Sequence, residues 1–384
     1  MSRQNPNRHD IPAIAANFEI FGEFHAYEPF GNGHINDTYA ASYVQGGAII
    51  RYIHQRVNHK IFKNPVAQME NIQRVTAHMR AKLPAKSRLR ATREILTVVP
   101  ARGGKPFFTD KDGNFWRTYV LIEGARSIDV AGNTDQAFEA ARAYGKFQRQ
   151  LVDFPPPRLH DIIPDFHHTP KRVHALEVAI RENAAGRAKR AAREIEFALK
   201  RKPDASRLIE LMIAGAMPER IVHNDTKLNN VLLDDKTGEG ICVVDLDTVM
   251  PGLALYDFGD MVRSTTSPAA EDERDLKKVF MRMEMFEALL RGYLEEAGSF
   301  LTDAEKKNLA FAGRLITYEI GCRFLADHLN GDVYFKVHRE GHNLDRARTQ
   351  FQLVASMEEQ DAEMNSLVAR VLKPKRKPSR RKKT

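Results

Sequence analysis

The sequence predicts an α+β protein with two lobes, a small β-rich N-lobe followed by a larger, mainly helical C-lobe. Residues 20–56 contain apolar and β-branched runs separated by Gly-Asn-Gly and Gln-Gly-Gly, a pattern typical of strands joined by turns. From about residue 134 onward, apolar residues recur every three or four positions over long segments, which predicts helices. A hairpin pattern at residues 230–249, where two apolar runs flank Lys-Thr-Gly-Glu-Gly, interrupts the helical part.

The N-lobe is expected to contain five strands and one helix. Three strands come from residues 20–56. Two more are predicted at 94–100 and 115–124, because both segments are apolar and Gly-Gly and Asp-Gly turn signals lie between them. Residues 65–81 have the apolar spacing of a helix, and Pro65 suits its first turn. The C-lobe helices are predicted at 134–152, 171–202, 204–216, 269–297, 303–330 and 343–370.

The positive charge of the chain is concentrated at its end. The net charge is +9, but the last twelve residues, KPKRKPSRRKKT, contain eight Lys or Arg and no acid, so the other 372 residues carry +1. We expect this segment to be a disordered, solvated tail rather than a site for specific nucleic acid. The chain is therefore divided into an N-terminal extension (1–19), an N-lobe (20–124), a C-lobe (125–372) and a basic tail (373–384).

Cysteine content and hydropathy favour a cytoplasmic protein. Cys242 and Cys322 lie 80 residues apart in apolar surroundings, which fits buried thiols better than a disulfide framework or a zinc site. The N-terminus has no apolar signal segment, and no run approaches the roughly 18 apolar residues of a membrane span. No oligomer seam is visible in the pattern, and we expect a monomer or a weak homodimer.

The segment IVHNDTKLNNVLLD carries a pattern suited to phosphoryl transfer. In kinase chemistry one loop supplies an aspartate that accepts the proton of the attacking hydroxyl, and also an asparagine ligand for Mg²⁺. Asp225 and Asn230, five residues apart, fit these roles, and Asp245 follows an apolar run after the hairpin turn, where it would hold the same metal. Asp247 is either a second ligand or a structural residue.

A literal Asp-Phe-Gly, the metal-binding triplet of protein kinases, occurs later in the chain at residues 257–259. It begins 32 residues after Asp225, beyond a Pro-Gly turn, and does not end the hairpin. We therefore assign the metal to Asp245. Asp257 and Asp260 are expected to support the catalytic loop by hydrogen bonds.

A glycine-containing loop in the N-lobe is a candidate nucleotide-binding loop. Gly31, Gly33, His34 and Asn36 lie between two predicted strands, and such a loop offers backbone N–H groups to phosphates. Gly-Asn-Gly is also an ordinary hairpin turn, so the loop alone does not establish a nucleotide site.

A basic residue on the third strand should reach the α- and β-phosphates of a nucleotide. The predicted strand contains no lysine, so Arg56 is the candidate, and Gln55 is the alternative occupant of that position. Glu70, on the following helix, would orient the basic group, although a lone glutamate is also an ordinary surface charge.

Together these residues resemble the aminoglycoside phosphotransferase and choline kinase superfamily, the small-molecule branch of the protein-kinase fold. His223, Asp225, Asn230 and Asp245 meet its pattern His-x-Asp-x-x-x-x-Asn followed by a strand that ends in aspartate. The similarity is closer still to N-acetylhexosamine 1-kinases. It rests on five ordered blocks: GNGHINDTY, YIHQRVNHKIFKNPVAQMENI, HNDTKLNNVLLD, VVDLDTVMPGLALYDFGD and CRFLADHLNGDVYFKVHREGHNLDRARTQ.

The resemblance implies ATP- and Mg²⁺-dependent phosphorylation of the anomeric hydroxyl of N-acetylglucosamine or N-acetylgalactosamine. Asp225 would be the catalytic aspartate and would contact the substrate. Asn230 and Asp245 would bind Mg²⁺, and Arg323 and Tyr334 would hold the sugar. Without the resemblance, Arg323 would be expected to form a helix ion pair with Asp327, four residues on.

The resemblance also implies a hinge at Leu121–Gly124, where backbone groups of Leu121 and Glu123 would bind adenine. Trp116, just before this hinge, is expected to pack in the core rather than to stack on substrate. The missing strand lysine and the basic tail depart from the family pattern.

Two other readings of the sequence stay open. The first is a kinase of the same fold that acts on an aminoglycoside, choline, homoserine or another sugar, since a fold does not determine a substrate. The near-neutral body mildly favours a neutral sugar over a cationic alcohol. The second is a non-catalytic binding protein, either a pseudokinase or a protein that binds nucleic acid through its basic tail. The retained base and metal ligands argue against this second reading.

Overall fold

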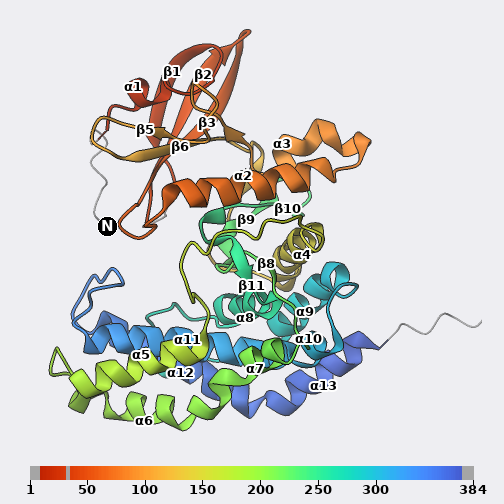
Figure 1. Ribbon diagram of the computed structural model, residues 1–384. Coiled ribbons are helices and arrows are strands. Elements are labelled where there is room, and N and C mark those ends of the chain that lie inside the picture. Colours follow the sequence, from red (N-terminus) through yellow and green to blue (C-terminus); the bar gives the residue numbers. More distant parts are fainter. Residues whose placement is uncertain (1–8, 32–34, 374–384) are drawn as a thin grey trace, which may run out of the picture.

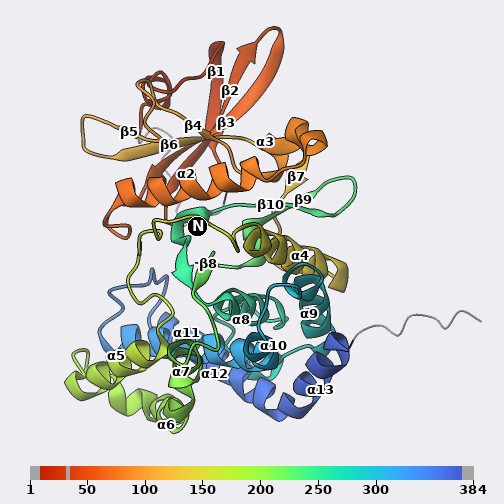
Figure 2. The same cartoon turned by 45° about the vertical axis from the view of Figure 1, so that its right-hand side comes forward.

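The computed structural model describes residues 9–31 and 35–373, and it confirms the predicted α+β architecture with two lobes (Figure 1). The sheet of the N-lobe lies at one end of the molecule, and the helices of the C-lobe form the other end. Figure 2 shows helix α2 (Pro65–Ala81) running below the sheet, between the sheet and the C-lobe.

The N-lobe sheet is antiparallel, with strand order β1-β2-β3-β6-β4 and with β5 paired to β6. Its register pairs Gln55 with Arg117 and Arg56 with Trp116, so successive side chains alternate between the two faces. The strands are β1 (Glu23–Pro29), β2 (Asp37–Gln45), β3 (Ala48–Val57), β4 (Val98–Val99), β5 (Phe108–Thr109) and β6 (Phe115–Val120).

The two faces of this sheet are covered by different elements. Ile11 and Ile14 of the short helix α1 (Ile11–Ala15) pack with Trp116 on one face, so part of the expected N-terminal extension belongs to the N-lobe core. Trp116 is fully buried and donates its indole N–H to Asp110 at 2.8 Å, which confirms its packing role. The other face meets α2, where Pro65 and the Asn64 cap start the helix as predicted.

The C-lobe is built around α11 (Leu309–Leu329), most of whose residues are buried. This helix packs against α5 (Thr169–Glu182), α8 (Ala254–Thr265) and α12 (His342–Glu359), and α4 (Thr134–Gln150) packs against α9 (Met283–Ala297). The remaining helices are α3 (Ala91–Glu94, in the N-lobe), α6 (Ala192–Lys200), α7 (Arg207–Ile213), α10 (Asp303–Lys307) and α13 (Asp361–Leu372).

Short strands connect the lobes. The sheet ends at Val120, and β7 (Ala125–Arg126) already pairs with β9 (Val231–Asp234) of the C-lobe, so residues 121–124 form the crossing. Strand β9 pairs with β10 (Gly240–Val243), which confirms the predicted hairpin, and β8 (Arg220–Val222) pairs with β11 (Met250–Gly252). In the described ranges, no helix is long and apolar enough to cross a membrane.

The structure corrects several predicted helix boundaries. The helix predicted at 171–202 ends at Glu182, because Asn183 is a left-handed cap with φ of 42° and Gly186 follows with φ of 68°. The helix predicted at 269–297 begins only at Met283. Helix α8 was not predicted. Cys242 and Cys322 are both buried and free, as expected.

Candidate active site

The loop between β8 and β9 is held from below by helix α8. The Asp257 carboxylate accepts hydrogen bonds from the backbone N–H groups of His223 at 3.0 Å and Asn224 at 2.8 Å. The Asp260 carboxylate accepts one from Thr226 N–H at 2.8 Å. Asn224 has a φ of 66°, a left-handed conformation that asparagine tolerates better than most residues. The predicted supporting role of Asp257 and Asp260 is confirmed.

His223 joins this loop to the end of β10. Its Nε2 lies 2.9 Å from the carbonyl oxygen of Val244, and its Nδ1 accepts the backbone N–H of Asp225 at 3.3 Å. The Val244 N–H in turn donates to the carbonyl oxygen of Asn230 at 2.9 Å. These contacts bring Asp225, Asn230 and the strand end that precedes Asp245 into one site.

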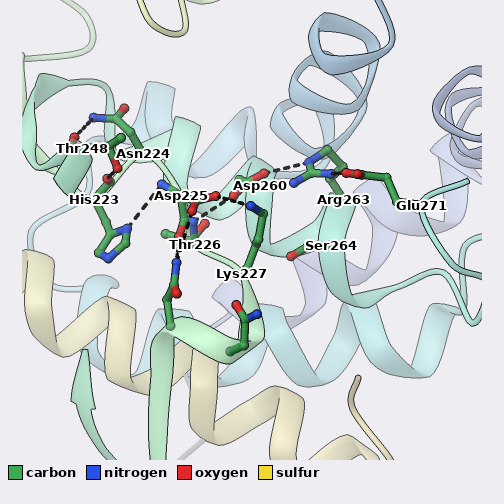
Figure 3. A network of polar contacts seen from close by, with 12 residues as sticks. His223, Asn224, Asp225, Thr226, Lys227, Thr248, Asp260, Arg263, Ser264 and Glu271 are labelled. Carbon is green, nitrogen blue, oxygen red and sulfur yellow. Dashed lines mark hydrogen bonds and ion pairs between the residues drawn. The ribbon is translucent and has the colours of Figure 1, made fainter. Parts of the chain in front are cut away.

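Asp225 forms an ion pair with Lys227, with 2.9 Å between Oδ1 and Nζ, and Figure 3 shows the two side chains facing each other. Burial alone would raise the pKa of the Asp225 carboxyl, but the charge of Lys227 and its hydrogen bond outweigh burial and hold that pKa below its usual range. Asp225 is therefore ionised at neutral pH and can accept a proton. Lys227 was not predicted as a site residue. Its position two residues after Asp225 could have indicated an ion pair with that carboxylate.

Asp245 lies close to two other carboxylates, those of Asp247 and Asp225. Its side chain reaches solvent, but the surrounding protein, and then the carboxylates of Asp247 and Asp225, raise its pKa to about 7. Asn230 donates its side-chain N–H to the Asp225 carbonyl at 2.8 Å, which leaves its amide oxygen for a ligand.

Within the described ranges, no group of three His, Cys, Asp or Glu side chains could hold a metal by itself. Mg²⁺ commonly takes one or two carboxylates and completes its shell with water and phosphate oxygens. Asn230 and Asp245 fit such a partial site.

Asp247 is engaged by the N-lobe. Its side chain is nearly buried, with Oδ1 at 2.5 Å from Nη1 of Arg117 and Oδ2 accepting from Nδ2 of Asn36 at 2.7 Å. The second of its two predicted roles, a structural one, is therefore the role seen in this structure.

The expectation that Arg56 anchors phosphates, oriented by Glu70, is wrong in this geometry. Arg56 lies on the sheet face covered by α1 and pairs with Asp37 at 2.6 Å. Glu70 lies on α2, at the opposite face, and its Oε2 is 2.9 Å from Nε2 of His160 at the surface. The prediction identified a basic residue on β3 but not the face to which it points. Gln55, the alternative, does lie on the face toward α2.

The glycine loop is described only in part. Gly31 is exposed, with a φ of 76°, whereas Gly33 and His34 lie outside the described residues. Asn36 is buried, and besides its bond to Asp247 it accepts the backbone N–H of Asn58 at 2.9 Å. A direct role of these residues toward phosphates stays a prediction.

The crossing segment is fixed by two arginines. The Leu121 N–H donates to the carbonyl oxygen of Arg51 at 3.0 Å, and the Glu123 carboxylate pairs with the Arg51 guanidinium at 2.6 Å. Arg93 donates to the carbonyl oxygens of Glu123 and Gly124. The segment is held in place as a hinge would require, and its contact with adenine stays a prediction.

Arg323 lies beside the loop that carries Tyr334. The Arg323 guanidinium lies 4.9 Å from the ring centre of Phe166 and 5.7 Å from that of Phe335, the neighbour of Tyr334. The alternative helix ion pair with Asp327 is not formed, because the Asp327 carboxylate accepts the backbone N–H groups of residues 333–335 instead.

A buried pair connects the catalytic loop to the helix of Arg323. His167 Nε2 lies 3.1 Å from the carbonyl oxygen of Asn224, and its Nδ1 lies 2.8 Å from Oε1 of Glu319, one turn before Arg323. Burial lowers the pKa of His167, but Glu319 more than offsets this and the net shift is upward. No local sequence pattern indicated these two residues, which lie 152 positions apart.

Comparison with known proteins identifies the family. A model described as the phosphotransferase enzyme family (APH) matches residues 26–304, which is most of the chain. The chain belongs to this phosphotransferase family. The family comprises the aminoglycoside phosphotransferase and choline kinase superfamily that the motifs resembled.

Solved structures of phosphotransferases share the fold. An aminoglycoside phosphotransferase from Alicyclobacillus acidocaldarius has a TM-score of 0.57 at 12% identity, covering 96% of this chain and 98% of that one. A spectinomycin phosphotransferase in complex with ADP and spectinomycin has a TM-score of 0.55 at 12% identity, covering 92% and 97%. A choline kinase from Cryptosporidium parvum has a TM-score of 0.50 at 14% identity, covering 94% and 99%. The fold of this phosphotransferase is thus protein-kinase-like.

Proposed function

We propose that this phosphotransferase uses ATP and Mg²⁺ to phosphorylate the anomeric hydroxyl of an N-acetylhexosamine, giving the sugar 1-phosphate. One observation carries the proposal: a single loop places the ionised Asp225, paired with Lys227, beside Asn230 and the strand end that leads to Asp245. A proton acceptor next to metal ligands is what phosphoryl transfer requires of a protein.

The proposed reaction assigns a role to each of these side chains. Asp225 accepts a hydrogen bond from the acceptor hydroxyl, aims its oxygen at the γ-phosphorus and takes the proton late in the step. The new O–P bond forms while the bond from the γ-phosphorus to the bridging oxygen breaks, and ADP leaves with that electron pair. Asn230 and Asp245 would hold Mg²⁺, which supplies charge neutralisation when bound.

Lys227 has a second use in this scheme. Its Nζ stays 2.9 Å from Asp225 and its side chain is 46% exposed, so it is available to the transferring phosphoryl group. An ammonium group at this point stabilises negative charge where it develops.

The acceptor side supports a neutral substrate. Arg172 donates to the carbonyl oxygen of Phe166 at 3.0 and 3.1 Å, and the Arg323 guanidinium lies over the ring of the same phenylalanine. Burial, and then the charge of Arg323, lowers the pKa of Arg172. A cationic alcohol, such as an aminoglycoside or choline, would add a third positive charge beside these two. A neutral sugar would instead receive hydrogen bonds from them.

The test is a panel of acceptors. ADP release would be followed with ATP and Mg²⁺ in the presence of N-acetylglucosamine, N-acetylgalactosamine, glucose, galactose and kanamycin. Each product would be examined for an acid-labile anomeric phosphate. We expect turnover with the N-acetyl sugars only. Turnover with kanamycin alone would overturn the proposed acceptor and leave a phosphotransferase of another substrate.

Asp225→Asn provides the matched control for this panel. The change keeps size and shape but removes the proton acceptor, so turnover should fall by about 10²- to 10⁴-fold, the usual contribution of acid–base catalysis. ATP binding should persist. Undiminished turnover in this variant would remove Asp225 from the mechanism.

A further inference from the structure

A nucleotide site in this fold needs a cation on the N-lobe side, and the expected strand does not supply one. Gln55 occupies the position on β3 that faces α2, and Arg56 points to the opposite face. The neighbouring strand carries Arg117 directly opposite Gln55, so the guanidinium lies on the face toward α2. Gln55 Oε1 accepts from Nε and Nη2 of Arg117 at 2.8 and 2.5 Å, which fixes the direction of its side chain.

Arg117 is an unusual residue for a protein interior. Its side chain is 1% exposed, it touches Met69 of α2, and its guanidinium lies 5.3 Å from the ring centre of Tyr119. A buried guanidinium requires a negative partner. Here that partner is Asp247, at 2.5 Å, which belongs to the C-lobe.

Asp247 is a meeting point of the two lobes. Besides Arg117, it contacts Asn36 through Oδ2 at 2.7 Å, and its backbone carbonyl accepts from Nε2 of Gln68 on α2 at 3.3 Å. Three N-lobe side chains therefore converge on one C-lobe residue, two positions after the proposed metal ligand Asp245.

We propose that Arg117 is the phosphate-binding cation of the nucleotide site, and that Asp247 is its counter-ion only while nucleotide is absent. A planar guanidinium with several N–H donors suits phosphate oxygens. The diphosphate group of ADP also carries more negative charge than one carboxylate, so it can displace Asp247 from Arg117. When the phosphates pair with Arg117, Asp247 is released toward the metal site beside Asp245. The ion pair between the lobes is thus a resting arrangement that nucleotide replaces.

This inference rests on the nucleotide-dependent part of the proposed function and not on the acceptor. The test is calorimetric binding of ADP and of adenosine in the presence of EDTA, so that neither a metal nor turnover contributes. Adenosine lacks phosphates and reports the rest of the site. The ratio of the two affinities therefore isolates the phosphate contact.

The key variant is Arg117→Met combined with Asp247→Asn, which removes both charges and leaves neither one buried alone. We expect ADP affinity to fall by about 10- to 100-fold, as for a lost charged hydrogen bond, with adenosine affinity unchanged. Asp247→Asn alone should raise metal-free ADP affinity, because Arg117 no longer has a competing partner. Arg56→Met, on the opposite sheet face, is the matched control and should change neither affinity.

The outcomes are distinguishable. If the double variant keeps the wild-type ratio of ADP to adenosine affinity, Arg117 is a structural residue and the inference is overturned. The same conclusion follows if Asp247→Asn weakens ADP binding in EDTA. If the wild-type chain binds ADP neither in EDTA nor with Mg²⁺, the proposed function fails together with this inference. If it binds ADP only with Mg²⁺, this inference alone is overturned. Thermal unfolding of each variant verifies that the compared proteins are folded. If the double variant does not fold, Arg117→Lys, which keeps the positive charge, replaces it.

Discussion

The carboxylate of Asp327 accepts a hydrogen bond from the backbone N–H of Tyr334, with 2.8 Å between the two atoms. The same carboxylate also accepts the N–H groups of Val333 at 3.0 Å and Phe335 at 2.9 Å, and the side-chain N–H of Asn343 at 2.9 Å. Tyr334 is 57% exposed, so packing does little to hold it. Asp327, one turn after Arg323 on α11, therefore fixes the loop that carries Tyr334, a proposed sugar-binding residue.

Asp327→Asn should loosen this loop. The amide replaces a charged acceptor with a neutral one, and hydrogen bonds to a charged group contribute about 1.5–3 kcal/mol. We expect the KM for the sugar to rise several-fold while the KM for ATP is unchanged, as measured by ADP release. Asp161→Asn, which removes an exposed ion pair with Arg158, should leave both KM values unchanged. An equal rise in both KM values would mean that Asp327 supports the lobe as a whole.

Asp257→Asn should disturb the catalytic loop itself. This carboxylate is fully buried and holds the backbone of His223 and Asn224, directly before Asp225. The asparagine amide keeps one acceptor oxygen, but its NH₂ group would face the other backbone N–H, and two donors cannot form a hydrogen bond. A misplaced catalytic group costs on the order of 100-fold in rate, so kcat should fall by about that factor.

The measurement for Asp257→Asn is kcat under saturating ATP and sugar, with thermal unfolding recorded in parallel. Asp235→Asn, which breaks an exposed ion pair with Arg126, is the control and should retain kcat. A variant that melts earlier but keeps kcat would show that Asp257 contributes to stability and not to the position of Asp225.

The catalytic loop could be predicted because its chemistry is local. The spacing of His223, Asp225 and Asn230, and the strand end before Asp245, lie within one stretch of sequence, and the structure brings them together. The supporting role of Asp257 and Asp260 could also be predicted, because the position of Asp257 in the sequence did not fit the metal-binding role. The lobes followed from the change in apolar periodicity along the chain.

The contacts between the lobes could not be predicted, because they depend on which face of a strand a side chain takes. Arg56 and Arg117 are both basic residues on N-lobe strands, and only the register, which pairs Arg56 with Trp116, separates their faces. A shift of one position exchanges the two faces of a strand. Helix α8 was missed for a different reason: nearly all of its residues are buried, including the charged Asp257, Asp260 and Arg263, so its polar side chains do not form the solvent-exposed face that identifies a surface helix.

Gly292→Ala should destabilise the C-lobe. Gly292 lies on α9 where this helix crosses α4, and an added Cβ would lie 2.1 Å from the carbonyl oxygen of Phe138. Because that atom belongs to the backbone of a packed helix, the helices must move apart, at a cost of about 1–3 kcal/mol. Chemical denaturation would measure the loss. Gly132→Ala, where the new Cβ would meet only Gln136 Oε1 at 3.5 Å, is the control. Equal stabilities of the two variants would contradict the close crossing of α4 and α9 at Gly292.

The buried pair of His167 and Glu319 should make stability depend on pH. The folded-state pKa of His167 is raised above its ordinary value of about 6.5, so the contribution of the histidine is complete below that pH and is lost as pH rises through the folded pKa. The pKa of Glu319 is lowered, so the contribution of the glutamate is complete above about 4.3 and is lost only in stronger acid. The pair is therefore fully effective between about pH 4.3 and 6.5.

Glu319→Gln tests this dependence. Removing one partner of a buried ion pair costs about 3–5 kcal/mol, and we expect that loss near pH 6 and a smaller one at pH 8.5, where His167 no longer needs a counter-charge. Denaturant unfolding at pH 6, 7 and 8.5 gives the comparison. Glu70→Gln is the matched control, because it also removes a carboxylate from a histidine, His160, but at a half-exposed site where the effect should be small at every pH. If the wild-type and Glu319→Gln stabilities stay parallel over this range, His167 is neutral in the folded protein. The link between the catalytic loop and α11 is then an ordinary hydrogen bond.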